Sequence, residues 1–493
     1  MGHARRTNDR PYPARRRLKS VKPAKENIKS SPGATVAFVL GLMVTSLYVE
    51  ANTPSTLAHG YAVGVAASFA LSLAIDFRRD FRNLIRTDLM AISSLYFLTL
   101  FEFLLPQTTF DTMVTLSELK PALTACLVGF AGLAIGRHFA PHATRDFQGL
   151  LRREVSPNVL ISIFTVGLVG GYFHMLLAVD FDFLLMLDYF MAPRFSQPWS
   201  RGRFGDWKAL LGEFGMVVYL VPPIAGIVLA NRARYNSRQL AYVTVGFLFT
   251  LFYGFSSGTR NIFATYLATF LVAYVFSYDT KRKKELIAVS AITAALMLAA
   301  TVVMLEFRNI GFTNYLEGYK EIREAKKETE FFVDYNLYVI AKLVDIFPQR
   351  YDYLGFQIPY LAIIRPIPRA LWPGKPEGMS VSIEDAVGVE GLTLASSFVG
   401  EAYMSGGTVG VFLTGLAFGG IAGWWNRLGQ NGNSPFGHLI FASGFFAAVI
   451  SMRSMFVFTT AILPTIGALV LGHWLLKRYP IRRLAPPPES DGT

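Results

Sequence analysis

The stretch Asn158–Ala178, NVLISIFTVGLVGGYFHMLLA, decides the fold class. It contains no aspartate, glutamate, lysine or arginine, and His174 is its one side chain that titrates near neutral pH. An α-helix of about 20 apolar residues is long enough to cross the hydrocarbon core of a bilayer. The stretch therefore predicts a membrane-spanning helix.

Similar apolar runs recur along the whole chain of 493 residues, which is 52% hydrophobic and only 16% charged. The mean hydropathy is +0.37, whereas a soluble domain carries about 25% charged residues. We therefore predict an all-α, polytopic integral membrane protein of about 12 transmembrane helices. The expected ranges are 33–50, 57–76, 87–105, 121–140, 158–178, 209–230, 239–256, 260–278, 284–305, 408–427, 436–452 and 455–476.

The distribution of lysine and arginine predicts the orientation. Most of the 47 basic residues fall in the two tails and in alternate short loops. Cytoplasmic loops carry an excess of these residues, so both tails are expected in the cytoplasm. The net charge of +13 is then mostly a topology signal, with some contact to anionic lipids, and it indicates no nucleic-acid partner.

One large extracytoplasmic loop is expected at 306–407, between the predicted helices of 33–305 and those of 408–476. Within it, Val333–Phe347 and Leu354–Ile364 are apolar but too short to span a bilayer, so we expect short interfacial helices there. The basic, proline-rich tail 1–32 is expected to be disordered and cytoplasmic, and the tail 477–493 is expected on the same side.

Several arginines are expected at the outer ends of the helices. Arg260 ends the short loop GFSSGTR, Arg453 lies in SMRSM, Arg308 follows a helix in LEFRNIG, and Arg194 lies in another outer loop. A guanidinium group donates two parallel hydrogen bonds to phosphate. In a helix bundle these arginines can converge on one cavity and bind a lipid-linked phosphate or pyrophosphate. The alternative is that each contacts lipid headgroups or a nearby acid.

The stretch RPIPRALWPGKPEG, Arg365–Gly378, adds more cations on the same side. Its prolines restrict the backbone to extended or turn geometry, so Arg365 and Arg369 are expected to project from a stiff segment. Lys375 is either a further phosphate contact or a solvated charge. Trp372 is either a platform for a sugar ring or an interfacial anchor.

A family resemblance rests on these residues. The string IPRALWPGKP is preceded by DIFPQRYDYLGFQIPY and followed by SSFVGEAYMSGGTVG, and SGTR precedes an earlier predicted helix. Together they resemble the bacterial oligosaccharide repeat-unit polymerases, the Wzy-type O-antigen polymerases. The resemblance covers 253–420, whereas the N-terminal half is similar only in hydropathy.

This resemblance implies a membrane glycosyltransferase of GT-C-like architecture in the bacterial inner membrane, with its active site facing the periplasm. It would join undecaprenyl-pyrophosphate-linked oligosaccharides into a surface polysaccharide such as O-antigen, capsule or exopolysaccharide. The implied donor is the lipid-linked glycan itself, without a metal or another cofactor. Membrane lipids are implied partners, and the resemblance allows a chain-length regulator and a flippase in addition.

Glycan transfer from a polyprenyl pyrophosphate also needs a base for the acceptor hydroxyl. Glu401, in VGEAYMSGG, is the first candidate because it enters a predicted membrane helix among small residues, where acids are usually functional. The alternative is a structural partner for one of the arginines. His174 is the second candidate, and its alternative is a hydrogen-bonded structural histidine.

Other functions have weaker support in the sequence. The chain has no Walker loop, CxxC pair, HExxH or EF-hand loop, and Asp180–Asp182 is the nearest approach to an Asp-x-Asp site. A ligase that transfers the same glycan to another lipid would use the same arginines and stays open. A transporter or flippase of lipid-linked oligosaccharides also stays open, favoured by Pro222 and Pro223 inside a predicted helix, because transporters use broken helices.

Overall fold

The apolar stretch around His174 forms one helix, α6 (Pro157–Ala178), in the computed structural model of the chain. The helix begins at a proline, whose missing N–H group costs nothing in the first turn. Three further helices begin in the same way, at Pro32, Pro54 and Pro435. Proline therefore marks the start of each of these helices.

The structure describes residues 30–78, 85–140, 149–152, 154–193, 196–199, 211–212, 214–278, 282–307, 310–319, 336–367, 369, 371–376, 379–381, 383, 395–431 and 434–478. The predicted tails lie almost wholly outside these residues.

The described part is built from α-helices and short 3-10 helices. The helices of its first half are α1 (Pro32–Tyr48), α2 (Pro54–Phe77), α3 (Thr87–Thr99), η2 (Phe101–Leu104), η3 (Thr108–Thr112), α4 (Leu116–Gly136), α6, α7 (Phe183–Met191), η4 (Gly215–Leu220), α9 (Val221–Ala230) and η5 (Arg232–Arg234). Those that follow are α10 (Ser237–Ser256), α11 (Arg260–Ser277), α12 (Lys283–Phe307), α13 (Phe312–Leu316), α14 (Asn336–Ile346), α15 (Gln357–Ile364), α17 (Ser397–Asn431), α18 (Pro435–Ile450), α19 (Met455–Ala461) and α20 (Leu463–Arg478).

The all-α prediction is confirmed for the described residues, and the helices indicate a membrane-embedded protein. Helices long and apolar enough to cross a membrane number six there, and three shorter apolar helices accompany them. The six are Pro54–Phe77, Leu116–Gly136, Pro157–Ala178, Ser237–Ser256, Ser397–Gly429 and Met455–Leu475, and the shorter ones are Pro32–Tyr48, Gly215–Ala230 and Pro435–Ile450.

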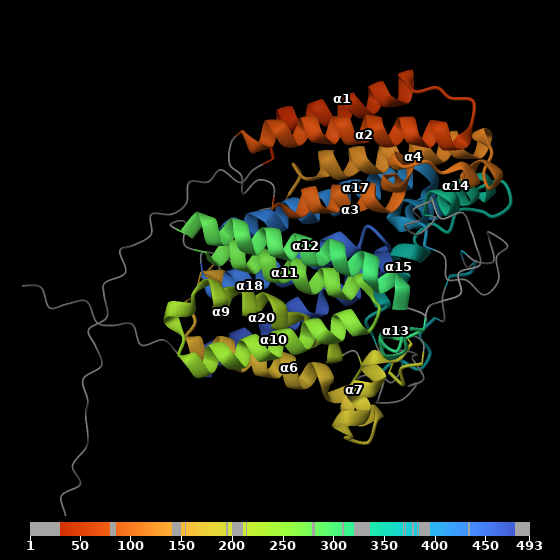
Figure 1. The fold of residues 1–493 in the computed structure, drawn as a ribbon. Helices are drawn as coiled ribbons and strands as arrows, with labels where there is room; N and C mark the ends of the chain where they lie inside the picture. Colours follow the sequence, from red (N-terminus) through yellow and green to blue (C-terminus); the bar gives the residue numbers. More distant parts are fainter. Residues whose placement is uncertain are drawn as a thin grey trace, which may run out of the picture.

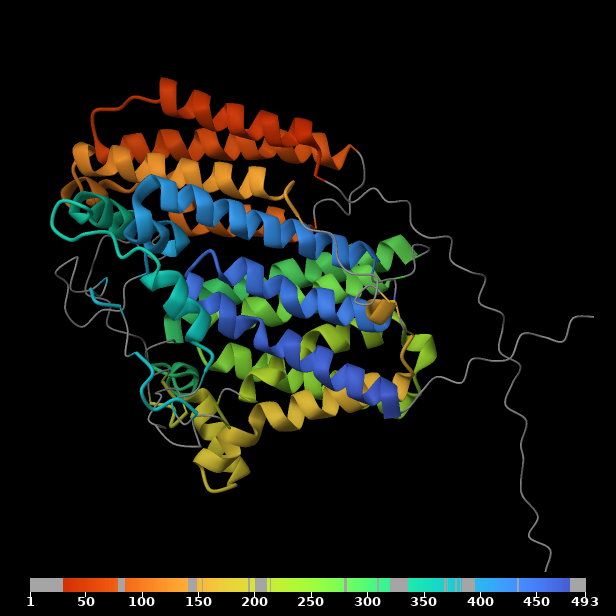
Figure 2. The same ribbon diagram turned by 180° about the vertical axis from the view of Figure 1, so that it is seen from behind.

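The long helices lie side by side in one bundle, with their axes in roughly the same direction (Figure 1). Seen from behind, the start of α1 and the end of α20 lie at the same end (Figure 2). We call this the inner end, following the orientation that the sequence predicts. The opposite end, which carries α7, α13, α14 and α15, is called the outer end.

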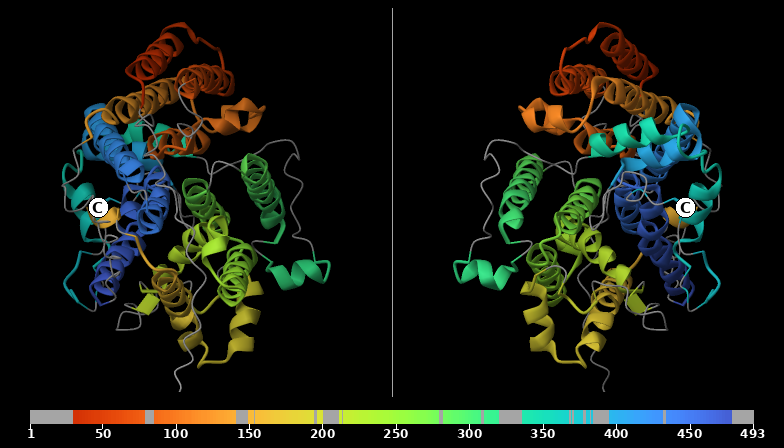
Figure 3. Two further views of the ribbon diagram at one scale, coloured as in Figure 1. Left: turned by 90° about the vertical axis from the view of Figure 1, so that its left-hand side faces the viewer. Right: turned by 90° about the vertical axis from the view of Figure 1, so that its right-hand side faces the viewer.

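Two large hydrophobic cores and a small one between α11 and α12 hold the described part of the bundle together. One large core is formed by α1–α4, α14 and the outer part of α17, and the other by α6, α9, α10, α11, α18 and α20. The end-on views show these groups as two neighbouring sets of helices (Figure 3). α17 and α18 contact each other, so they join the two cores.

The contact between α4 and α17 is a seam of small residues. Gly415, Gly419 and Gly423 recur every fourth residue on α17, and a Cβ atom on Gly419 or Gly423 would overlap with a carbonyl oxygen of α4. Small residues at this spacing let two backbones approach closely inside a membrane, where apolar burial alone gives little attraction between helices. The seam therefore fixes α17 against α4.

We expect a Gly419→Ala variant to be destabilised by about 1–3 kcal/mol, because the added methyl group meets the Leu133 carbonyl oxygen in a packed interface. Gly420→Ala is the matched control, since its Cβ atom would lie 3.7 Å from the nearest neighbouring atom, the Gly136 carbonyl oxygen. Thermal unfolding of both purified variants in detergent measures the difference. Equal melting temperatures of the Gly419→Ala and Gly420→Ala variants would contradict the proposed role of the seam in stability.

Several predicted helices are interrupted. The helix expected at 209–230 is in fact η4 followed by α9, and Pro222 and Pro223 stand in the first turn of α9, where proline lacks the N–H group that a continuous helix needs. The helix expected at 408–427 continues an earlier helical piece that begins at Ser397, and the break at Gly406 and Gly407 lies just before the predicted start. The described end of the predicted loop 306–407 is thus helical.

The first of the two short helices expected in the outer segment corresponds to α14, which packs into the bundle. Leu337, Ile340 and Leu343 are fully buried because α14 packs against both α4 and α17. Lys342 Nζ lies 2.6 Å from Glu118 Oε1 at the start of α4. The helix is apolar on most sides, so it is covered by the bundle.

Candidate functional site

Glu401 lies on the outer part of α17 and is almost fully buried, with 4% of its surface exposed. Ser454 Oγ donates a hydrogen bond of 2.5 Å to Oε1, and the Met455 amide donates one of 2.6 Å to Oε2. Ser454 is also the N-cap of α19. Both carboxylate oxygens are therefore held against the first turn of α19, where an anion is favoured by the helix dipole.

The outer part of α17 ends at the break at Gly406 and Gly407, and the loop between α14 and α15 stabilises this break. Leu354 and Gly355 donate backbone hydrogen bonds of 2.8 and 3.0 Å to the carbonyl oxygens of Met404 and Ser405. Gly407 has φ of +62°, and a Cβ atom there would lie 2.7 Å from the Tyr353 hydroxyl oxygen. Glycine fits this position because it has no side chain.

Arg365 is the candidate cation beside Glu401. Its guanidinium carbon lies 5.8 Å from the centre of the Phe456 ring, and its charge interacts electrostatically with the Glu401 carboxylate. Arg365 caps α15 in helical geometry, with φ of −50° and ψ of −44°, so the backbone is not extended before Pro366. A buried carboxylate and an arginine are thus brought together from segments far apart in sequence.

Lys375 and Arg369 form hydrogen bonds to backbone carbonyl oxygens of the segment in which they lie. Lys375 Nζ donates to the carbonyl oxygens of Arg365 and Ile367 at 2.8 and 2.9 Å, and Arg369 Nη1 donates to the Lys375 carbonyl oxygen at 3.1 Å. Trp372 lies within the turn and is partly exposed. The described residues of this segment therefore form a turn closed by hydrogen bonds from its own cations, which is one of the two geometries that the prolines favour.

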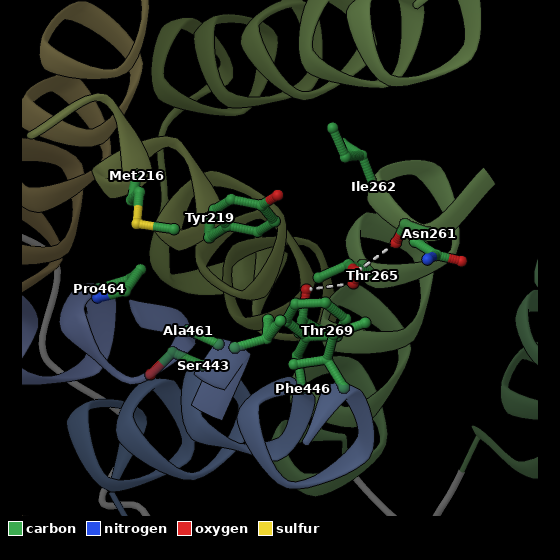
Figure 4. Close-up of a pocket in the computed structure, with 12 residues that line it drawn as sticks. Met216, Tyr219, Asn261, Ile262, Thr265, Thr269, Ser443, Phe446, Ala461 and Pro464 are labelled. Atoms are coloured by element: carbon green, nitrogen blue, oxygen red, sulfur yellow. Dashed lines mark hydrogen bonds between the residues drawn. The ribbon is translucent and has the colours of Figure 1, made fainter. Parts of the chain in front are cut away.

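Arg260 begins α11 and lies next to a cavity of about 160 Å³. The cavity is drawn in Figure 4, where Tyr219 and Met216 face residues of α11 and α18 across it. Its walls are mostly apolar, and Thr265 and Thr269 place hydroxyl groups among them. The complete lining is Met216, Tyr219, Asn261, Ile262, Thr265, Thr269, Ser443, Phe446, Ile450, Val457, Ala461 and Pro464.

α19 stands between this cavity and Arg365. Val457 and Ala461, four residues apart, line the cavity, whereas Thr459 donates a hydrogen bond of 2.6 Å to the Ala362 carbonyl oxygen of α15. Residues four apart share one face of a helix, and residues two apart do not. The cavity, whose lining includes Asn261 next to Arg260, and α15, which ends before Arg365, therefore lie on different sides of α19, and Arg453 lies in the turn that leads into it.

The other predicted site residues lie apart from Glu401 or outside the described residues. His174 is on α6 and faces Gly215 of η4, and α6 packs against η4, α9, α10 and α20. Arg194 and Arg308 lie outside the described residues. Among the residues that the structure describes, no three His, Cys, Asp or Glu side chains gather as a metal site requires.

The inner end holds a buried charge cluster that the sequence analysis missed. Arg86 Nη1 lies 2.8 Å from Asp76 Oδ2, and Asp88 Oδ2 lies 3.0 Å from Arg86 Nη2 and 3.1 Å from Arg137 Nη1. At most 4% of any of these residues is exposed. The two arginines and two aspartates form a charge-balanced cluster, which we call the inner charge cluster.

Polar neighbours complete the inner charge cluster. Asn426 Nδ2 donates to Asp88 at 2.5 Å while its oxygen accepts from the Thr87 amide, and Arg137 Nη2 donates to Thr35 at 2.6 Å. These contacts join α1, α2, α3 and α17 to the end of α4. Arg86 and Arg137 lie in short loops whose basic residues serve in the sequence only to predict orientation, and the number of lysines and arginines in a loop does not show whether they are buried.

The comparisons with known proteins place the chain in a family without assigning a function. No curated protein and no solved structure matches it. One family model, described as a domain of unknown function, matches residues 236–482 and so covers half of the chain. The matched region contains Glu401 and the arginines from Arg260 to Arg453, but neither Arg194 nor His174. The chain belongs to the DUF8712 family, which is defined by this domain of unknown function.

Proposed function

We propose that the protein is a glycosyltransferase that joins oligosaccharide repeat units carried on a polyprenyl pyrophosphate, acting at the periplasmic face of the bacterial inner membrane. The observation that carries this proposal is the buried Glu401 at the outer end of the bundle, bonded to Ser454 and Met455, with Arg365 packed on the adjacent Phe456 ring. The proposal also includes about 12 membrane spans and cytoplasmic tails, as the lysine and arginine distribution predicts.

In the proposed reaction an acceptor hydroxyl oxygen attacks the anomeric carbon of the donor glycan. The bond from that carbon to the pyrophosphate oxygen breaks, Glu401 accepts the hydroxyl proton, and the pyrophosphate leaves with its negative charge. Positioned cations stabilise such a leaving group electrostatically. Arg365 is assigned this role on one side of α19, and Arg260 at the positive N-terminus of α11 on the other.

The cavity beside Arg260 is assigned to the apolar carrier. Its volume of about 160 Å³ is close to that of an engineered protein cavity of roughly 150 Å³ that binds benzene. It can therefore hold a hydrocarbon group of that size, such as an isoprene unit next to the pyrophosphate. The cavity is lined by η4, α11, α18, α19 and the start of α20, so the carrier would lie against α19.

Complementation of a polymer-deficient strain tests the function. We expect Arg365→Ala and Arg260→Ala to lower polymer formation by about 100-fold or more, the cost of removing one charge-stabilising donor, and to leave single-repeat glycans. Arg232→Ala is the control, because this arginine is 55% exposed in a surface ion pair with Glu285. Membrane levels of each variant are compared by immunoblotting. Full-length polymer from both site variants at normal levels would contradict the proposed site.

A transporter of lipid-linked oligosaccharides is the second candidate, favoured by the interrupted helices. α17 is broken at Gly406 and Gly407, and η4 gives way to α9 at paired prolines, as in transporters with discontinuous helices. Purified protein in liposomes without an ion gradient separates the two functions, because a polymerase lengthens a pyrophosphate-linked glycan there and a transporter does not. The same assay with a lipid acceptor separates a ligase from a polymerase.

A further inference from the structure

An apolar stripe is exposed along α15 and the turn that follows it. Phe356, Ile363 and Leu371 are 72%, 64% and 70% exposed, and Tyr360 and Ile367 lie between them. The spacing of three or four residues places the α15 members on one face. A row of exposed apolar side chains of this length is unusual on a protein surface that faces water, and it marks an interaction site.

The opposite face of α15 sets its depth. Ile358, Leu361 and Ala362 are buried, and the Ala362 carbonyl oxygen accepts the hydrogen bond of 2.6 Å from Thr459. Thr459 is in the second turn of the candidate membrane span Met455–Leu475. The buried face of α15 contacts this span within the apolar part of the span. Ile363, on the exposed face of α15, therefore lies at about the same depth in the membrane.

The polar groups of the turn after α15 suit a position at the boundary between lipid headgroups and hydrocarbon. The ammonium group of Lys375 and the guanidinium group of Arg369 donate to backbone carbonyl oxygens of their own turn. Backbone carbonyls left unpaired in an apolar environment would be costly. Here the turn supplies its own donors, so it can rest where headgroups meet hydrocarbon.

We propose that α15 is inserted into the outer leaflet of the bilayer, with Phe356, Tyr360, Ile363, Ile367 and Leu371 in contact with lipid acyl chains. The insertion holds the turn from Arg365 to Lys375 at headgroup depth. The inference rests on the membrane span and on α15 alone, so it stands whether or not the protein transfers glycans.

Site-directed fluorescence in liposomes tests the insertion. Cys126, the sole cysteine, is fully buried, and Cys126→Ser gives a background into which Ile363→Cys is introduced and labelled with an environment-sensitive fluorophore. Val245→Cys on α10, where the native side chain is 66% exposed, is the lipid-facing control. Asp352→Cys in the exposed loop before α15 is the water-facing control.

We expect brominated lipids to quench the label at position 363 as strongly as the label at 245, and aqueous iodide to quench it much less than the label at 352. Iodide quenching equal to that at 352 would overturn the proposal and place the stripe in water. Protection from both quenchers would also overturn it, because a second protein surface would then cover the stripe. Leu371→Cys serves as a second position if the label at 363 disturbs folding.

Discussion

An Asp88→Ala variant is expected to lose about 3–5 kcal/mol of unfolding free energy, the cost of breaking a buried ion pair on one side. Asp88 contacts both Arg86 and Arg137, so its removal leaves two buried guanidinium groups opposite the single carboxylate of Asp76. Asn426 loses its carboxylate acceptor as well. The measurement is unfolding of the purified protein by SDS titration in mixed micelles.

The control for this prediction is Glu285→Ala. Glu285 pairs with Arg232 at 2.8 Å, but the side chains are 29% and 55% exposed, and exposed ion pairs contribute only about 0–1 kcal/mol. If both variants unfold at the same SDS fraction, the inner charge cluster is not a determinant of stability. A loss confined to Asp88→Ala would show that the cluster holds the helices of the first core together.

A Glu401→Gln variant is expected to lose polymer formation by about 10²–10⁴-fold, the usual contribution of a positioned general base. Glutamine keeps the size of the side chain and one acceptor oxygen, so the contact with Ser454 or Met455 can persist while the ability to take a proton is lost. The measurement is the rate of glycan lengthening by purified protein on a pyrophosphate-linked substrate.

Ser454→Ala separates a proton-accepting role of Glu401 from its role in fastening α17 to α19. This variant removes the 2.5 Å hydrogen bond but leaves the carboxylate and the Met455 contact, so we expect most activity to remain. Melting temperatures of both variants show whether folding is affected. A Glu401→Gln protein that makes normal polymer would reduce Glu401 to a purely structural cap of α19.

The helical architecture was accessible from sequence because apolar length and helix-start residues are local signals. The range predicted around His174 differs from α6 by one residue, and Pro32, Pro54 and Pro435 begin their helices. The helical piece of α17 before Gly406 and Gly407 was not predicted, because it falls in the segment expected as a loop. Two glycines suit a membrane helix as well as a break, and here the decision lies with a distant loop that bonds to Met404 and Ser405.

The inner charge cluster and the partners of Glu401 could not be predicted from the sequence, because they depend on contacts between distant segments. Asn426 and Thr87 are 339 residues apart in the chain and yet share a hydrogen bond in the inner charge cluster. Glu401 was selected as an acid that enters a predicted membrane helix among small residues. Its burial and its bonds to Ser454 and Met455 depend on how α17 meets α19. The roles proposed for Glu401, Arg260 and Arg365 remain predictions.

The interruption at Gly406 and Gly407 divides α17 into two mechanically separate pieces. The inner piece is clamped by the glycine seam and by Asn426, and the outer piece is held by α14, the loop at Leu354 and the start of α19. The hydrogen bonds from Leu354 and Gly355 fix the backbone just before the break, so the loop sets the orientation of the outer piece. The position of Glu401 therefore depends on the contacts of the outer piece, whereas the glycine seam anchors the rest of α17.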